Sequence, residues 1–141
     1  MEANVEGSEI IYDWNKIGFG RSLSDKPVLL LDETLRDGIQ SPSVVDPGIE
    51  DKIQILRLMN GLGVHVADIG LPGAGARAQE DVKALCEAIR DEKMGIKASC
   101  AARTHVNDIR PIIEISRETG VEIEVLTFLG SSPIRQYAED W

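Results

Sequence analysis

The sequence predicts an α/β fold made of successive strand–helix units whose strands run parallel. Apolar segments with strand character begin near residues 28, 64, 96 and 121. Their spacing of roughly 25 to 36 residues matches the length of one βα unit. The intervening segments carry apolar residues every three to four positions, as in an amphipathic helix. These observations fit two architectures, an open doubly wound sheet and part of a (β/α)8 barrel.

The first unit begins at Pro27, and its strand is expected over residues 28–33. Asp46 is expected to cap the following helix, with Pro47 at the first helical position. The apolar face of this helix is formed by Ile49, Ile53, Leu56 and Met59. Gly61 and Gly63 are expected to end the helix, because glycine commonly follows the last helical turn.

The second unit combines a strand over residues 64–69 with the turn GLPGAG and a helix. The buried face of that helix is expected to carry Val82, Leu85 and Ile89. Residues 70–75, which form the turn, contain part of the G-x-G-x-x-A pattern of dinucleotide-binding folds. The pattern follows the second strand of the series rather than the first, which favours a plain βα loop.

The third strand is expected over residues 96–100, followed by a helix that His105 opens and Gly120 ends. Its apolar positions are Val106, Ile109, Ile112 and Ile113. Pro111 interrupts them and should weaken or kink a turn if it lies inside the helix. Residues 121–128 are expected to form the fourth strand, before the loop LGSSP and the start of another helix.

Composition limits the possible partners of this chain. It has 141 residues, of which 43% are hydrophobic, and this is enough for one packed domain. The net charge of -9 is spread without a basic cluster, so nucleic acid is not an expected partner. No apolar run approaches the roughly 20 residues that span a bilayer, and the first residues are acidic, so we expect a cytoplasmic protein without membrane contact. Residues 1–26 lack a sustained period and predict an irregular arm whose aromatic side chains pack on a neighbouring surface.

The cysteines and histidines are expected to have structural roles. Cys86 and Cys100 show no metal-ligand spacing and are expected to be reduced packing residues. His65 and His105 form no His-x-His pair and are expected to be ordinary polar residues.

Polar residues follow several of the expected strands. Arg36 and Asp37 come after the first, and Arg103 comes after the third. In either parallel architecture the carboxyl ends of the strands lie on one face, so these residues should converge. Asp37 can then ligate a hard divalent cation, and Arg36 can offset negative charge on an enolate or alkoxide. The alternative is an exposed turn in which both residues make only local contacts.

The segment DETLRDGIQSPS resembles the D-x-T-L-R-D-G-x-Q signature of the metal-dependent synthases and lyases that include 2-isopropylmalate, homocitrate and citramalate synthases. Three later segments resemble this family in the same order: VADIGLPGAG, KASCAAR and LTFLGSSPI. The resemblance covers residues 28 to about 135. It implies a (β/α)8 barrel, with residues 27–141 as the N-terminal half of a synthase-like catalytic domain.

Details of the motif place the chain closest to the synthases. The positions that separate it from the lyase, carboxylase and aldolase branches are Thr34, Leu35, Gly38 and Gln40. Two positions depart from the synthases, because Ile39 and Asp68 stand where glutamate is common. These departures leave the α-keto acid open.

The resemblance implies an acyltransferase of amino-acid biosynthesis, such as leucine biosynthesis, that condenses acetyl-CoA with an α-keto acid and uses Mg²⁺ or Mn²⁺. It implies that Asp37 is a metal ligand and that Arg36 polarises the keto carbonyl and stabilises the alkoxide. Gln40 would orient the bound acid, and Arg103 and Ser131 would contact substrate. A surface ion pair for Arg103 and a helix N-cap for Ser131 remain alternative interpretations.

A barrel of this kind needs about 250 residues. The His-x-His metal ligands of the family belong to later strands, so we expect the isolated chain to bind metal weakly and to be inactive. A homodimer or a complementing C-terminal half is the expected partner. The alternatives are a non-catalytic half-barrel interaction module and a lyase or aldolase of the same superfamily.

Overall fold

The computed structural model describes residues 27–132, 135 and 137. The arm expected at residues 1–26, and most of the helix expected to follow the fourth strand, lie outside the described residues. Within the described part, β1 (Leu31–Asp32), β2 (Val66–Asp68), β3 (Lys97–Arg103) and β4 (Ile123–Phe128) form one sheet in the order β1-β2-β3-β4. All three pairings are parallel, as the βα spacing predicts.

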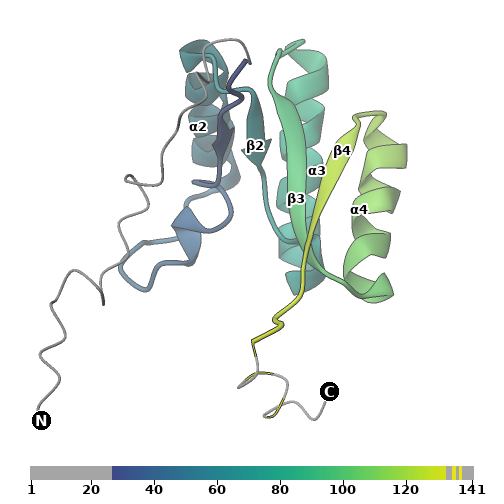
Figure 1. The fold of residues 1–141 in the computed structure, drawn as a ribbon. Helices are drawn as coiled ribbons and strands as arrows, with labels where there is room; N and C mark the ends of the chain where they lie inside the picture. The colour runs from purple at the N-terminus through teal and green to yellow at the C-terminus, as the bar shows by residue number, and fades with distance from the viewer. Residues whose placement is uncertain (1–26, 133–134, 136, 138–141) are drawn as a thin grey trace, which may run out of the picture.

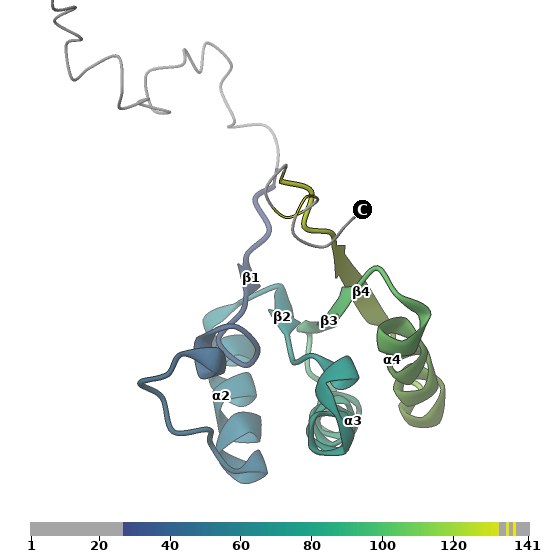
Figure 2. The same ribbon diagram turned by 90° about the horizontal axis from the view of Figure 1, so that it is seen from below.

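Three α-helices connect these strands: α2 (Ile49–Leu62), α3 (Ala76–Asp91) and α4 (Val106–Thr119). Figure 1 shows each helix beside the strands that it joins, and Figure 2 shows all three on one side of a curved row of strands. A doubly wound sheet places helices on both faces, whereas a (β/α)8 barrel places them only outside. The arrangement of the described elements therefore favours the barrel.

The core lies between the sheet and the helices. Leu56 of α2, Leu85 of α3 and Ile112 of α4 are almost completely buried against small strand residues such as Ala98 and Ala102. The face expected for α3 is confirmed, since Val82, Leu85 and Ile89 are buried. Both cysteines are free and buried within the same core, as expected.

The start of α2 differs from the expectation. The helix begins at Ile49 after Gly48, and the side chain of Asp46 does not cap it. Asp46 instead forms ion pairs with Lys52 and Arg77, which use the carboxylate that a cap would need. The prediction of Asp46 as the cap, and of Pro47 inside the helix, was therefore wrong.

Other boundaries shift by a few residues. β1 is limited to Leu31–Asp32, and the amide of Leu30 before it donates to the side chain of His65 instead of to a backbone carbonyl of β2. β3 continues to Arg103, beyond the expected residue 100, because its hydrogen-bonded register with β4 extends that far. In α4, Ile113 is 42% exposed, contrary to expectation, whereas Ile115 is buried. Pro111 lies inside the helix.

Both histidines have structural contacts. The amide of Leu30 donates to Nδ1 of His65 over 3.1 Å, which helps to join β1 to β2. His105 is the N-cap of α4, and its Nδ1 accepts a hydrogen bond from the amide of Asn107. Among the described residues, no helix is long and apolar enough to cross a membrane.

The two glycines near the end of α2 should respond in opposite ways to substitution. Gly61 lies inside the helix, whereas Gly63 is the C-cap with φ 81. Gly61→Ala should raise the free energy of unfolding by about 0.5–1 kcal/mol, because alanine favours the helix. Gly63→Ala should lower it by about 1 kcal/mol, because the left-handed backbone is strained for alanine. Neither added Cβ meets an atom within 4 Å, so urea unfolding would compare backbone effects alone. Equal midpoints would contradict the assignment.

Candidate active site at the carboxyl ends of the strands

The turn after β1 is built around the carbonyl of Glu33. The amides of Arg36 and Gly38 both donate to this oxygen, over 3.1 and 3.0 Å. Leu35 is 2% exposed and anchors the turn in the core. The short helix η3 (Gly38–Gln40) follows at once. This local geometry places Arg36 on the side that faces β2 and Asp37 toward solvent.

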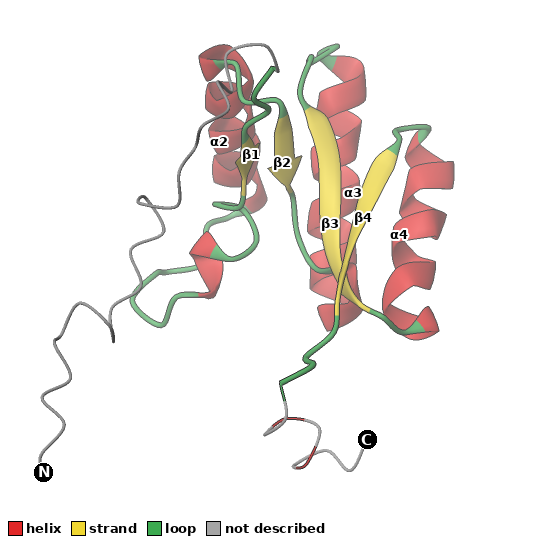
Figure 3. Cartoon of the chain, viewed as in Figure 1, coloured by secondary structure: helices red, strands yellow, loops and turns green. Residues whose placement is uncertain are grey.

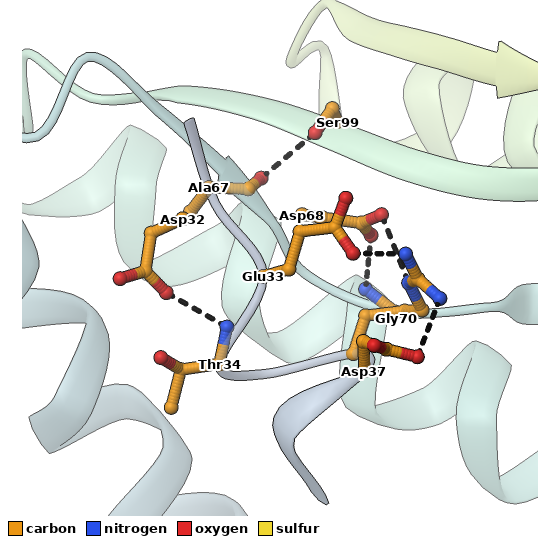
Figure 4. Close-up of polar contacts among 9 residues, drawn as sticks. Asp32, Glu33, Thr34, Asp37, Ala67, Asp68, Gly70 and Ser99 are labelled. Atoms are coloured by element: carbon orange, nitrogen blue, oxygen red, sulfur yellow. Dashed lines mark hydrogen bonds and ion pairs between the residues drawn. The ribbon is translucent and has the colours of Figure 1, made fainter. Parts of the chain in front are cut away.

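The guanidinium of Arg36 contacts three carboxylates (Figure 4). Its Nε donates to Oδ2 of Asp68 over 3.3 Å, and Nη1 donates to Oδ1 of Asp37 over 3.0 Å. Its Nη2 pairs with Glu33. The Arg36 side chain is 21% exposed, whereas Glu33 and Asp37 are 40% and 66% exposed. Arg36 is therefore fixed from the interior and accessible from outside.

Asp68 provides the interior contact. It ends β2 and is completely buried, and its Oδ1 accepts a hydrogen bond from the amide of Gly70 over 3.2 Å. Burial raises the pKa of Asp68 above its ordinary value, against the opposing effects of the Gly70 amide and the Arg36 guanidinium. Next to it, Ser99 donates to the carbonyl of Ala67 and satisfies its hydroxyl within the sheet (Figure 4). Asp68 thus sets the direction of the Arg36 guanidinium.

Gln40 also lies near Arg36. It is exposed at the end of η3, and both residues line a cavity of about 360 Å³ between the turn and α3. The residues expected after β1 are therefore brought together by the structure.

Arg103 has a different environment. Its Nε and Nη2 donate to the carboxylate of Asp108 over 2.7 and 2.8 Å, while its side chain remains 68% exposed. The Asp108 side chain is 4% exposed, and the hydrogen bonds from Arg103 lower its pKa against the opposing effect of burial. The pair agrees with the ion-pair interpretation of Arg103. A substrate oxygen would have to share this guanidinium with Asp108.

Ser131 lies exposed in the loop after β4. The hydroxyl of the next residue, Ser132, accepts a hydrogen bond from the amide of Arg135. This role for Ser132 was not predicted from the sequence.

Sequence reasoning also missed Glu33 and Asp108 as partners of the two arginines, and it noted Asp68 only as a departure from a motif. All three had the same signal. Each is an acidic residue near the carboxyl end of a strand. Glu33 and Asp108 lie within five residues of Arg36 and Arg103, and Asp68 ends the strand that pairs with β1.

The carboxylates of the described residues do not form a metal site by themselves. No group of three His, Cys, Asp or Glu side chains within this part of the chain is arranged to hold a metal ion. Glu33, Asp37 and Asp68 instead surround a guanidinium. Asp37, the most exposed of them, can supply one oxygen ligand, and a divalent cation prefers six or more.

Residues 27–138 match the HMGL-like family. The chain belongs to this family. The curved sheet of parallel strands, with helices on one side, is correspondingly half of a (β/α)8 barrel, and this confirms the fold expected from the motif resemblance.

Proteins named 2-isopropylmalate synthase are among the relatives of this HMGL-like chain. It is 37% identical over 109 residues to one from Heliobacterium modesticaldum, covering 77% of this chain and 20% of the relative. It is 36% identical over 92 residues to 2-isopropylmalate synthase 2 from Caldanaerobacter subterraneus, covering 64% of this chain and 22% of the relative. A Nitrosomonas eutropha 2-isopropylmalate synthase is 31% identical over 107 residues, 76% of this chain and 20% of the relative. The chain spans about a fifth of the length of these relatives.

Proposed function

We propose that this HMGL-like chain is part of a synthase that condenses acetyl-CoA with an α-keto acid, in the manner named for its 2-isopropylmalate synthase relatives. In this reaction a base removes a proton from the acetyl methyl group, and the carbanion attacks the keto carbonyl carbon. The carbonyl oxygen becomes an alkoxide and takes a proton. Water then cleaves the thioester and releases CoA.

The orientation of Arg36 is the observation that carries this proposal. Its Nε is held by the buried Asp68, while its other two nitrogens face the exposed carboxylates of Asp37 and Glu33. An incoming keto acid can replace those exposed partners without moving the guanidinium. A fixed cation of this kind stabilises the negative oxygen that develops during the attack. We assign Gln40, on the same turn, to orienting the keto acid.

We propose Asp37 as one ligand of a divalent cation, Mg²⁺ or Mn²⁺, whose other ligands lie outside the described residues. Its side chain is 66% exposed beside Arg36. Such a cation supplies Lewis-acid polarisation of a bound oxygen. Arg103 and Ser131 are proposed as outer substrate contacts. Both residues are exposed, at the end of β3 and after β4 respectively.

We propose that the sheet associates with a complementing C-terminal half or with a second copy of this chain. β1 and β4 end the row of described strands, and Val28, Leu29 and Leu30 beside β1 are 71%, 65% and 57% exposed. Unpaired edges and exposed apolar side chains favour association. The same surface supports the second candidate function, a half-barrel interaction module without catalysis.

Release of CoA distinguishes the two functions. The whole gene product would be mixed with acetyl-CoA and a panel of α-keto acids, with Mg²⁺ or Mn²⁺, and free thiol would be measured. We expect keto-acid-dependent release that a chelator abolishes and that Asp37→Asn lowers by about 100-fold or more. Asp51→Asn, which changes an exposed aspartate in the first turn of α2, is the matched control and should retain full activity. Absence of release with every keto acid would favour the interaction module.

A further inference from the structure

The segment that joins η3 to α2, residues 41–48, contains two exposed apolar side chains. Figure 3 shows it as loop between β1 and α2. Val44 and Val45 are 44% and 89% exposed. In the described part of the chain, the backbone hydrogen bonds within residues 33–48 reach no further than five residues along the sequence. Neither apolar burial nor a hydrogen-bonded ladder therefore holds this loop against the fold.

A cavity separates the turn before the loop from α3. Its volume is about 360 Å³, with Leu35, Ile39 and Gln40 on the side of the turn and Ala78 and Val82 on the side of α3. Leu35 anchors the turn in the core, but beyond it the gap reduces the dispersion contacts between α3 and the end of the turn that carries Gln40. The amide of Gln40 donates to the carbonyl of Asp37 over 3.1 Å, and the chain then continues directly into the loop.

A cluster of four charges lies at the same cavity, and we call it the Lys52 cluster: Asp46, Lys52, Arg77 and Asp81. Nζ of Lys52 lies 2.9 Å from Oδ1 of Asp46 and 2.7 Å from Oδ2 of Asp81. Nη2 of Arg77 lies 2.6 Å from Oδ2 of Asp46. Asp46 is in the loop, Lys52 in α2, and the other two in α3. The cluster therefore connects three separate segments and carries no net charge.

Lys52 is unusually buried for a lysine, with a side chain that is 5% exposed. A charged amine in the interior is costly unless carboxylates or other acceptors satisfy it. Burial has the largest influence on its pKa and lowers it, but the hydrogen bonds to Asp81 and Asp46 together raise the pKa of Lys52 above its ordinary value. If the loop withdrew Asp46, the buried ammonium would keep Asp81 as its carboxylate partner among the described residues.

We propose that Lys52 is a positioning residue that ties the loop of residues 41–48 to α3 through Asp46 and thereby holds Gln40 at the substrate side of the site. The inference rests on the proposed function for its catalytic consequence, and on the loop geometry alone for its structural consequence. Arg36 is fixed separately by Asp68. Loosening the loop should therefore weaken substrate binding more than the chemical step.

Two substitutions distinguish the link between the loop and α3, which we call the tether, from a general effect on stability. Asp46→Asn and Asp81→Asn each remove one carboxylate from Lys52, but only Asp46 belongs to the loop. In the whole gene product, hydrogen exchange at the amide of Val44, which donates to the carbonyl of Ser41 over 3.0 Å, should be about tenfold faster in Asp46→Asn, and within about twofold of the parent in Asp81→Asn. Lys52→Met leaves Asp46 paired with Arg77, so its exchange rate should lie between those of the parent and Asp46→Asn, and Lys52→Arg should partly restore protection. Equal exchange in Asp46→Asn and Asp81→Asn would overturn the proposal.

The catalytic consequence is measured in the whole gene product. Asp46→Asn should raise the KM for the keto acid about fivefold while kcat stays within about twofold, an effect of about 1 kcal/mol on binding. Lys83→Met is the control, because Lys83 also joins neighbouring helices through a carboxylate, Glu118 at 2.8 Å, but lies on α3 away from the cavity. A lower kcat with unchanged KM would overturn the assignment of Lys52 to substrate positioning. If the parent protein releases no CoA, the proposed function fails, and the exchange experiment still decides whether the tether exists.

Discussion

Replacing Arg36 with methionine should lower the free energy of unfolding by about 3 kcal/mol, because it leaves the carboxylate of Asp68 buried without its cation. Asp68 is completely buried, and without Arg36 the amide of Gly70 is its remaining hydrogen-bond donor among the described residues. In the active protein the same change should lower kcat by about 100- to 1,000-fold, as the loss of a preorganised charge at a developing oxyanion does. Urea unfolding and CoA release measure the two effects.

The pH dependence of this loss has a definite sign. The pKa of Asp68 is already raised by burial, and removal of Arg36 should raise it further. A raised pKa in the folded state means that stability is fully present below the unfolded value of about 3.9 and declines as pH rises through the folded value. The deficit of Arg36→Met should therefore be larger at neutral pH than near pH 4.

Two controls test whether the buried charge of Asp68 causes the loss of stability in Arg36→Met. Arg36→Met combined with Asp68→Asn should recover part of the lost stability, because the buried charge is then absent. Arg57→Met removes an exposed arginine whose Nη2 lies 2.6 Å from Glu92, and it should change stability little. If Arg57→Met is as destabilising as Arg36→Met, burial of Asp68 is not the cause.

Replacing Gly73 with alanine should destabilise the fold by about 2 kcal/mol, through overpacking against α4. Gly73 lies in the short helix η4 (Pro72–Ala74). A Cβ on Gly73 would lie 2.8 Å from Cγ and 3.0 Å from Oδ1 of Asp108. This carboxyl group cannot move aside freely, because Arg103 holds it through its backbone amide and its guanidinium. Urea unfolding near pH 7 measures the loss.

The free energy of unfolding measured at decreasing pH tests the same contact between position 73 and Asp108. Hydrogen bonds from Arg103 depress the pKa of Asp108, so this group contributes stability above its unfolded value of about 3.9 and loses it as pH falls through the folded value. A displaced Asp108 contributes less, so the deficit of Gly73→Ala should shrink between pH 6 and pH 3. Gly95→Ala is the control, because its added Cβ meets only Asn60 at 3.9 Å, and it should stay within about 0.5 kcal/mol of the parent. An unchanged midpoint for Gly73→Ala would show that the carboxyl yields.

The glycines of the turn GLPGAG illustrate how far a motif can be interpreted. The place of this turn after the second strand favours a plain βα loop over a dinucleotide-binding loop, but the sequence contains no reason for glycine at position 73. That reason is the close approach of η4 to Asp108, which belongs to a segment more than thirty residues away. Contacts between such distant segments leave no periodic signal in one sequence.

The start of α2 shows a similar limit. Asp46 followed by Pro47 has the pattern of a helix start, and that local pattern was misleading. A carboxylate can satisfy a helix amide or a buried ammonium, and the choice depends on where Lys52 and Arg77 lie in the folded chain. The tertiary ion pairs prevailed here over the local preference for a cap.

The sequence by itself determined the parallel order of strands and helices, the family, and the turn that carries Arg36 and Asp37, because each depends on local periodicity or a contiguous motif. Only the tertiary structure decided which carboxylates meet Arg36, why Gly73 must be small and how the loop before α2 is held. These features depend on burial, which converts weak surface pairs into specific constraints. Burial is a property of the packed chain, and a single residue pattern does not specify it.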